Sequence, residues 1–69
     1  MKFTIEQARK YRGYSQEALA NMLHIPKPTY YNYEHGRSVM RVDTAQKFAD
    51  IVGIPFNQII FYNETTEKM

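Results

Sequence analysis

The apolar residues of this chain recur at spacings of three and four, the period of a helix that buries one face. Ile5 and Ala8 lie about one turn apart and predict a first helix over 5–12. Thr4 and Gln7 stand at the spacing of a capping box, in which each side chain binds the backbone N–H of the other residue. We therefore expect a short, capped amphipathic helix near the start of the chain.

Two short helices separated by a tight turn are predicted between Ser15 and Gly36. Ser15 is a natural N-cap for the first of them, which we place over 16–23. The second should begin near Pro28, because proline is tolerated in the first turn of a helix, and should end before Gly36. The apolar face of the first helix is formed by Leu19, Ala20 and Leu23.

The second of these helices, over 28–35, has two different sides. Tyr30, Tyr33 and Glu34 share one side of the helical wheel, which we assign to the interior. A helix of two turns is not stable alone, so its neighbours must hold it while its other side stays free. A short helix braced in this way, with hydrogen-bonding groups outward, has the geometry that enters a DNA major groove. The outward residues are Lys27, Pro28, Tyr31, Asn32 and His35.

A longer amphipathic helix is predicted to start at Asp43 and to stop at Gly53. Asp43 and Gln46 repeat the spacing of a capping box. A short fifth helix should follow from Pro55. The stripe predicted to face the core from the fourth helix consists of Val42, Ala45, Phe48, Ala49 and Val52.

Four large apolar residues crowd the end of the predicted fifth helix, and they are Phe56, Ile59, Ile60 and Phe61. They exceed what one face of a small domain can hide. Two interpretations remain open, because these residues can pack on a second subunit or plug the core of the monomer. We expect residues 1–61 to form one domain and 62–69 to form a polar C-terminal tail.

Composition and charge limit the number of domains, the cellular compartment and the kind of partner that we expect. The 69 residues allow one domain with a modest core, and the chain has no cysteine for a disulfide or a thiolate metal site. No apolar run approaches membrane-spanning length, and the first residues lack a signal-peptide core, so we expect a cytoplasmic protein. The net charge is only +2, but Lys27, Arg37 and Arg41 flank the second helix of the pair against a single acid, Glu34. Phosphate contacts require such a local basic bias.

Catalytic and metal-binding patterns do not stand out in the sequence. His24 and His35 are separated by 11 positions and have no carboxylate pair at metal-ligand spacing beside them. The serines have no plausible base, and no glycine-rich loop is available to cradle a phosphate. We therefore expect no enzyme activity, no metal and no cofactor.

The stretch SQEALANMLHIPKPTYYNYEHG resembles the helix-turn-helix of the phage-repressor and Cro-like DNA-binding family, also described as xenobiotic-response-element-type regulators. The stretch VDTAQKFADIVGIPFNQIIF, over 42–61, resembles the fourth and fifth helices of that family. The resemblance covers about residues 3–61 and implies an all-α, compact five-helix, lambda-repressor-like domain. The matching motif positions are Ala20 at the helix crossing, Ile25 after the turn, Tyr30 and Tyr33 in the core, and Glu34 and Gly36 at the close.

The chain departs from the family pattern at two positions of the turn. His24 stands where the family usually has glycine, and a residue other than glycine can adopt a left-handed conformation there at some cost in strain. Pro26 stands where the family tends to have serine or threonine, so the second helix loses a side-chain cap.

An ion pair between Arg9 and Glu34 is also expected. Arg9 matches the first-helix arginine of the family and lies on the inward side of the helix over 5–12. A charge held near a core needs its opposite, and Glu34 is the nearest candidate in the motif.

The helical register and the resemblance together imply the site residues. Asn32 can offer a paired donor and acceptor to adenine, and Lys27 can reach guanine or a phosphate. Tyr31 can touch a thymine methyl group or a phosphate. Gln16 resembles the phosphate-contacting glutamine of the family, and its backbone N–H lies at a positive helix end. The base-reading candidates are Lys27, Pro28, Thr29, Tyr31 and Asn32, and the phosphate candidates are Gln16, Arg37 and Arg41.

These features favour a small transcriptional regulator, a repressor or a Cro-like switch protein, that binds a double-stranded DNA operator as a homodimer. Phage repressor, prophage repressor, restriction-control protein and antitoxin all fit this outline. Two other classes stay open. The same helix can dock in a groove of a partner protein, or the tyrosines can stack on single-stranded DNA or RNA.

Overall fold

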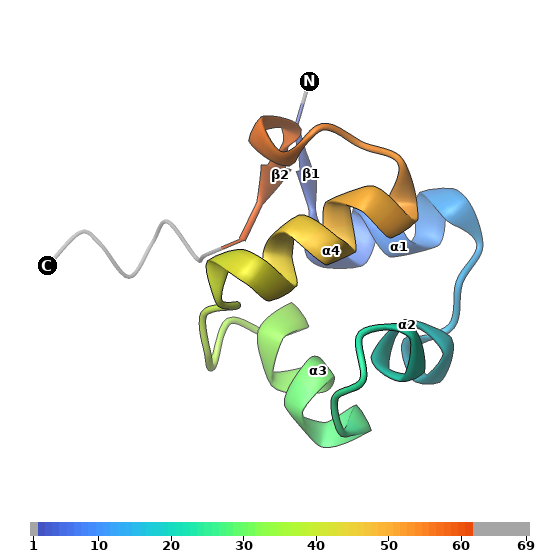
Figure 1. Cartoon of the computed structure of the whole chain (residues 1–69), viewed down its shortest axis with the longest axis vertical. Helices are drawn as coiled ribbons and strands as arrows, with labels where there is room; N and C mark the ends of the chain where they lie inside the picture. The colour runs from blue at the N-terminus through green and yellow to red at the C-terminus, as the bar shows by residue number, and fades with distance from the viewer. Residues whose placement is uncertain (1, 62–69) are drawn as a thin grey trace, which may run out of the picture.

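The computed structural model describes residues 2–61, and these form four α-helices and one short pair of strands (Figure 1). The expectation of a polar tail over 62–69 lies outside the described residues. The elements in chain order are β1 (Phe3–Thr4), α1 (Ile5–Arg12), α2 (Gln16–Met22), α3 (Lys27–Glu34), α4 (Val42–Val52), the 3-10 turn η1 (Phe56–Gln58) and β2 (Ile59–Ile60).

The first helix is capped as its sequence predicts. The Thr4 hydroxyl accepts from the backbone N–H of Gln7 at 3.0 Å, and the Gln7 side chain accepts from the backbone N–H of Thr4 at 3.0 Å. At the other end, Gly13 takes a left-handed conformation with φ of 80°, and its N–H donates to the carbonyls of Arg9 and Lys10. These two caps fix the length of α1 and therefore the place where α2 begins.

The predicted fifth helix is wrong. After Pro55 the chain makes one 3-10 turn and then becomes extended, and β2 pairs in parallel with β1 at the start of the chain. Ile59 lies opposite Phe3 in this register, and Ile60 lies opposite Thr4. β-branched isoleucines favour extended backbone, and a one-turn helix gains too little to compete with strand pairing. The fold is therefore four helices closed by a small parallel strand pair.

The start of α4 also differs from the prediction. Arg41 occupies the N-cap position, and the predicted capping box of Asp43 and Gln46 does not form: Asp43 accepts from the N–H of Thr44, and the Gln46 amide donates to Asp50. Val42 is 75% exposed and does not belong to the core stripe. Helical side chains point back toward the N-terminus, so from the first position this side chain projects beyond the end of the helix.

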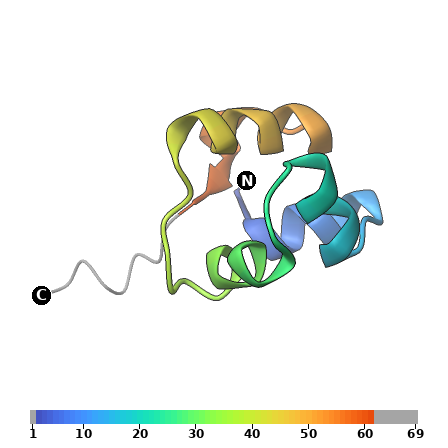
Figure 2. The same cartoon turned by 60° about the horizontal axis from the view of Figure 1, so that its bottom comes forward.

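The core lies between α4 on one side and α1, α2 and α3 on the other (Figure 2). Tyr30, Phe48, Leu19 and Val52 are its largest fully buried side chains. The Phe48 ring meets the Phe61 ring edge-on, with centroids 6.1 Å apart, so the segment after α4 closes the core. This packing holds the inner face of α3 in place. The remaining buried residues are Ile5, Ala8, Ala20, Leu23, Met40, Ala45, Ala49, Ile54, Ile59 and Phe61.

Most of the apolar surplus near the C-terminus is used inside the monomer. Ile59 and Phe61 are 6% and 8% exposed, whereas Phe56 remains 38% exposed beside them. Phe56 packs on Phe61 with ring centroids 5.0 Å apart. Of the two interpretations of this cluster, the monomer plug therefore accounts for Ile59 and Phe61, and Phe56 retains exposed apolar surface.

Candidate nucleic-acid interface

The turn between α2 and α3 is built around His24. Its φ is 60°, in the left-handed region, at the position where the related family usually has glycine. The N–H of His24 donates to the carbonyl of Asn21 at 3.1 Å, and the N–H of Ile25 donates to the carbonyl of Ala20 at 3.0 Å. These bonds close the last turn of α2 and turn the chain directly into α3, at a strain cost on the order of 1–2 kcal/mol for a residue other than glycine.

The second helix of the motif, α3, begins one residue earlier than predicted. Lys27 is the first residue of α3, Pro26 is its N-cap, and Pro28 follows in the first turn. Proline at this position loses no helical hydrogen bond, because the first N–H groups of a helix have no partner within it. At the other end Gly36, with φ of 74°, ends the helix, and the N–H of Arg37 donates to the Asn32 carbonyl at 2.9 Å.

The inner side of α3 is held by a cluster of hydrogen bonds to one carboxylate. Arg9 donates from Nε to Oε2 of Glu34 at 2.6 Å, as expected for an ion pair between the first helix and the motif. The hydroxyl of Tyr30 donates to the same oxygen at 2.6 Å, and the amide of Gln16 donates to Oε1 at 3.0 Å. The Glu34 side chain is only 2% exposed, so this carboxylate joins α1, α2 and α3 inside the protein.

The ionisation of this cluster follows from its bonding. Burial opposes the charge on Glu34, but the hydrogen bonds from Arg9, Tyr30 and Gln16 outweigh it and hold the pKa of this carboxyl below its usual value. The hydrogen bond to Glu34 raises the pKa of Arg9 in turn. Burial, which has the larger effect, and the hydrogen bond to Glu34 both raise the pKa of the Tyr30 phenol far above its ordinary value. The cluster is therefore a fixed charge pair with a neutral phenol.

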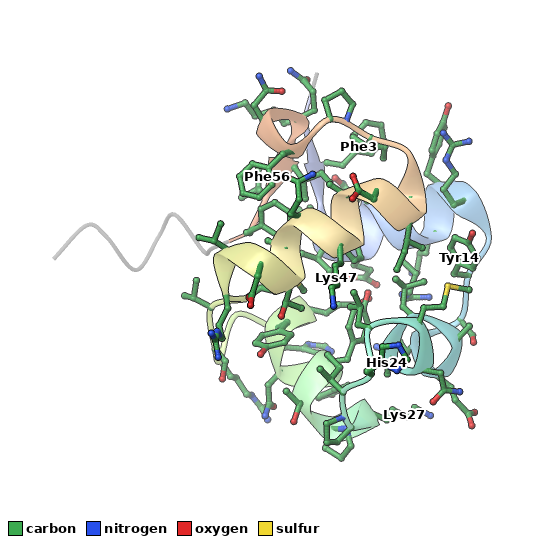
Figure 3. The ribbon with its side chains drawn as sticks, in the orientation of Figure 1. Phe3, Tyr14, His24, Lys27, Lys47 and Phe56 are labelled. Atoms are coloured by element: carbon green, nitrogen blue, oxygen red, sulfur yellow. The ribbon has the colours of Figure 1, made fainter. Side chains whose placement is uncertain are left out.

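The outer side of α3 is polar and accessible. Lys27 and Pro28 are exposed, and Figure 3 places Lys27 at the end of the molecule opposite Phe3. Tyr31 is 40% exposed, whereas Thr29 and Asn32 are half-buried at the edges of this face. The structure thus places the five residues that the sequence predicts for base reading on one helix, α3. The opposite side of this helix is held by the hydrogen bonds to Glu34.

The predicted phosphate contacts are distributed around this helix. Arg37 lies three residues after Glu34, the last residue of α3. Arg41 lies exposed before α4, with Nε 3.7 Å from a carboxylate oxygen of Asp43. Gln16 is less free than the sequence suggests, because one N–H of its amide already binds Glu34. Its amide carries a second N–H.

Sequence reasoning missed three contacts on α3. The bonds from Tyr30 and from Gln16 to Glu34 were not expected, and neither was the packing of the His35 ring on Tyr31. The spacing of four residues in two of these pairs is a signal that helical geometry offers. The Gln16 contact has no such signal, since it joins separate helices. Among residues 2–61, no group of three His, Cys, Asp or Glu side chains is placed to hold a metal ion, and no helix is long and apolar enough to cross a membrane.

Comparison with known proteins agrees with this geometry. Residues 5–59 match the helix-turn-helix family. The cryptic phage CTXphi transcriptional repressor RstR of Vibrio cholerae is 33% identical over 61 residues, which cover 88% of this chain and 55% of the relative. The chain thus spans about half the length of that relative, and no solved structure matches it significantly. The chain belongs to the helix-turn-helix family, the phage-repressor and Cro-like DNA-binding proteins that its sequence resembles.

Proposed function

We propose that this protein is a sequence-specific transcriptional regulator that reads double-stranded DNA with α3 in the major groove. The observation that carries the proposal is the division of α3 into two sides. Its inner side is fixed through Tyr30 and Glu34, and its outer side presents exposed hydrogen-bonding groups. A groove-reading helix needs this combination, because a rigid support lets side chains meet base edges in one register.

Base reading is assigned to five residues of α3. The amide of Asn32 bonds to the N6 and N7 positions of an adenine, and the ammonium of Lys27 bonds to a guanine. Tyr31 contacts a thymine methyl group. Pro28 and Thr29 lie beside them at the start of the helix and shape the fit of the helix in the groove.

Phosphate binding is assigned to residues at the ends of the motif. Arg37 and Arg41 are exposed cations in the segment that follows α3. Gln16 uses its backbone N–H and the second N–H of its side-chain amide, while the first binds Glu34. Such contacts fix the position of the protein on the duplex and make its affinity depend on salt.

We further propose that the protein binds its operator as a homodimer. Of the four apolar residues predicted to contact a second subunit, Ile59 and Phe61 are buried in the core. Phe56 is exposed and Ile60 is half-buried, so these two retain apolar surface for such a contact. A domain of this size covers few base pairs, so two copies on two half-sites give the length that a specific operator requires.

The direction of regulation is proposed from the relative. RstR is described as a transcriptional repressor of a cryptic phage, and this chain matches 55% of its length. Repression by occupying an operator, or by a Cro-like switch, requires no further catalytic or effector group in the described residues. We therefore favour repression over activation.

Selection of bound duplexes from a random DNA pool tests this function. We expect a conserved operator with two related half-sites about one helical turn apart. Affinity for it should fall steeply as salt rises. Asn32→Ala should weaken binding, whereas Lys10→Ala, which removes an exposed charge on α1, should not. Recovery of no preferred duplex, or tighter binding to single strands or to a protein, would contradict the proposal.

A further inference from the structure

The outer face of α3 carries an aromatic pair formed by the base-reading candidate Tyr31 and by His35, which is not one of those candidates. The rings of Tyr31 and His35 lie with centroids 4.0 Å apart and planes 34° from parallel. Both residues are exposed, so the two rings pack against each other on the surface rather than in the core. They are four positions apart, which makes them neighbours on one side of the helix.

His35 lies at the C-terminal end of α3, where backbone hydrogen bonds close the helix. His35 is the C-cap of α3, and its N–H donates to the carbonyl of Tyr31 at 3.1 Å. The next residues close the helix end, where Gly36 is left-handed and the N–H of Arg37 reaches the Asn32 carbonyl. The imidazole is therefore attached to backbone that is fixed at the helix end. The exposed Tyr31 ring packs against it.

A ring contact of this kind selects one side-chain conformation. An exposed tyrosine on a helix otherwise exchanges among rotamers within nanoseconds. Packing of aromatic rings favours the packed arrangement by about twofold to tenfold over the alternatives. Binding that uses the preferred rotamer then loses less conformational freedom when the side chain becomes ordered.

We propose that His35 is a positioning residue that holds Tyr31 in the conformation in which Tyr31 contacts its base. The inference rests on the proposed DNA-reading function of α3 and adds a residue to it. His35 acts through the Tyr31 ring and does not touch DNA itself. A planar ring at this position is sufficient for the role, whether or not it carries charge.

The packing is tested first in the free protein. His35→Phe keeps a ring at this position and His35→Ala removes it. By NMR, the Tyr31 ring protons should shift on His35→Ala and the Tyr31 Hα–Hβ couplings should become averaged, whereas His35→Phe should keep one dominant Tyr31 rotamer. Both variants should melt near the wild-type temperature, since the substituted residue, His35, and the ring it packs on, Tyr31, are both exposed. Unchanged Tyr31 couplings in His35→Ala would overturn the proposal.

The consequence for binding is tested on the selected operator. His35→Ala should weaken binding by about twofold to tenfold, and His35→Phe should restore most of the loss. The loss should be confined to the base pair that Tyr31 reads, as shown by operators changed at single positions. In a Tyr31→Ala background, His35→Ala should have no further effect, because its action passes through the missing ring.

Other outcomes would overturn the positioning role. If His35→Phe binds as weakly as His35→Ala and both lower the salt dependence by about one phosphate contact, His35 binds the backbone itself. Additive losses from Tyr31→Ala and His35→Ala would likewise mean independent contacts. If the wild-type chain prefers no duplex at all, the proposed function fails together with the role of His35, even where NMR shows the packed rings.

Discussion

At the scale of single residues, Glu34 is the side chain on which the motif most depends. It accepts hydrogen bonds from Arg9, Tyr30 and Gln16, and its side chain is almost fully buried. The inward position of Arg9, the need of a charge near the core for an opposite charge, and the family resemblance together predicted the pairing of Arg9 with Glu34. The convergence of Tyr30 and Gln16 on the same carboxylate depends on how the helices cross, and spacing alone does not predict it.

Removing the Glu34 carboxylate should be strongly destabilising. Glu34→Ala removes the opposite charge of Arg9 and the acceptor of the Tyr30 hydroxyl, at a cost of about 3–5 kcal/mol in the free energy of unfolding. Denaturant unfolding is measured for Arg9→Ala, for Glu34→Ala and for the variant that carries both changes. The three free energies of unfolding, with that of the wild type, give the coupling energy between Arg9 and Glu34. The double variant should lose less than the sum of the single losses, and additive losses would show that the ion pair contributes nothing.

The same carboxylate should make stability depend on acid. The pKa of Glu34 is lower in the folded protein than its ordinary value of 4.5, so its contribution is complete above about pH 4.5 and is lost as the pH falls through the folded pKa. Glu34→Gln has no proton to bind there and should show a flatter decline in unfolding free energy over that range. Glu17→Gln, at an exposed position, is the matched control and should decline like the wild type.

At the scale of elements, α3 shows how much the sequence could predict. Helical period placed Tyr30 inside and Tyr31 outside, and their exposures are 0% and 40%. Helix boundaries agreed within one residue, because Ser15, Pro28 and Gly36 act locally. The segment after Pro55 could not be predicted in the same way. Its pairing partner, Phe3, lies at the other end of the chain, so a local pattern favoured a helix where a distant strand favours extension.

The adjacent tyrosines of α3 should separate stability from binding. Tyr30→Ala opens a cavity in the core and should cost roughly 3–5 kcal/mol, comparable with the whole stability of a small domain of about 5 kcal/mol. Tyr31→Ala should melt within a few degrees of the wild type and lose about 1–3 kcal/mol of binding free energy. Thermal melts and DNA titrations on both variants check this. An unfolded Tyr31→Ala beside a folded Tyr30→Ala would mean that α3 is rotated from our assignment.

At the scale of the whole molecule, the fold separates the core from the surfaces available to partners. The helices and the strand pair enclose one core, and α3 presents its outer side at one end of the domain (Figures 1 and 2). Figure 3 shows Phe56, the first residue of η1, away from this end. If a second subunit packs at Phe56, as proposed, it leaves α3 free for DNA, as a dimeric operator requires.

Truncating Phe56 should weaken assembly on DNA more than contact with a half-site. Phe56→Ala removes exposed apolar surface and should reduce affinity for a two-half-site operator, with little change for a duplex that carries one half-site. Tyr11→Ala, at an exposed aromatic residue of α1, is the control. Gel-shift titrations on the two duplexes measure both affinities. Equal losses on the two duplexes would argue against a dimer contact at Phe56.

One measurement tests most directly whether α3 reads DNA bases. The base preference at every operator position is measured for the wild type and for Asn32→Ala. We predict a loss of about 1–3 kcal/mol on the operator, with the preference for adenine relaxed at a single position in each half-site and the other preferences kept. An unchanged preference profile, or an equal loss of affinity on all sequences, would contradict the account.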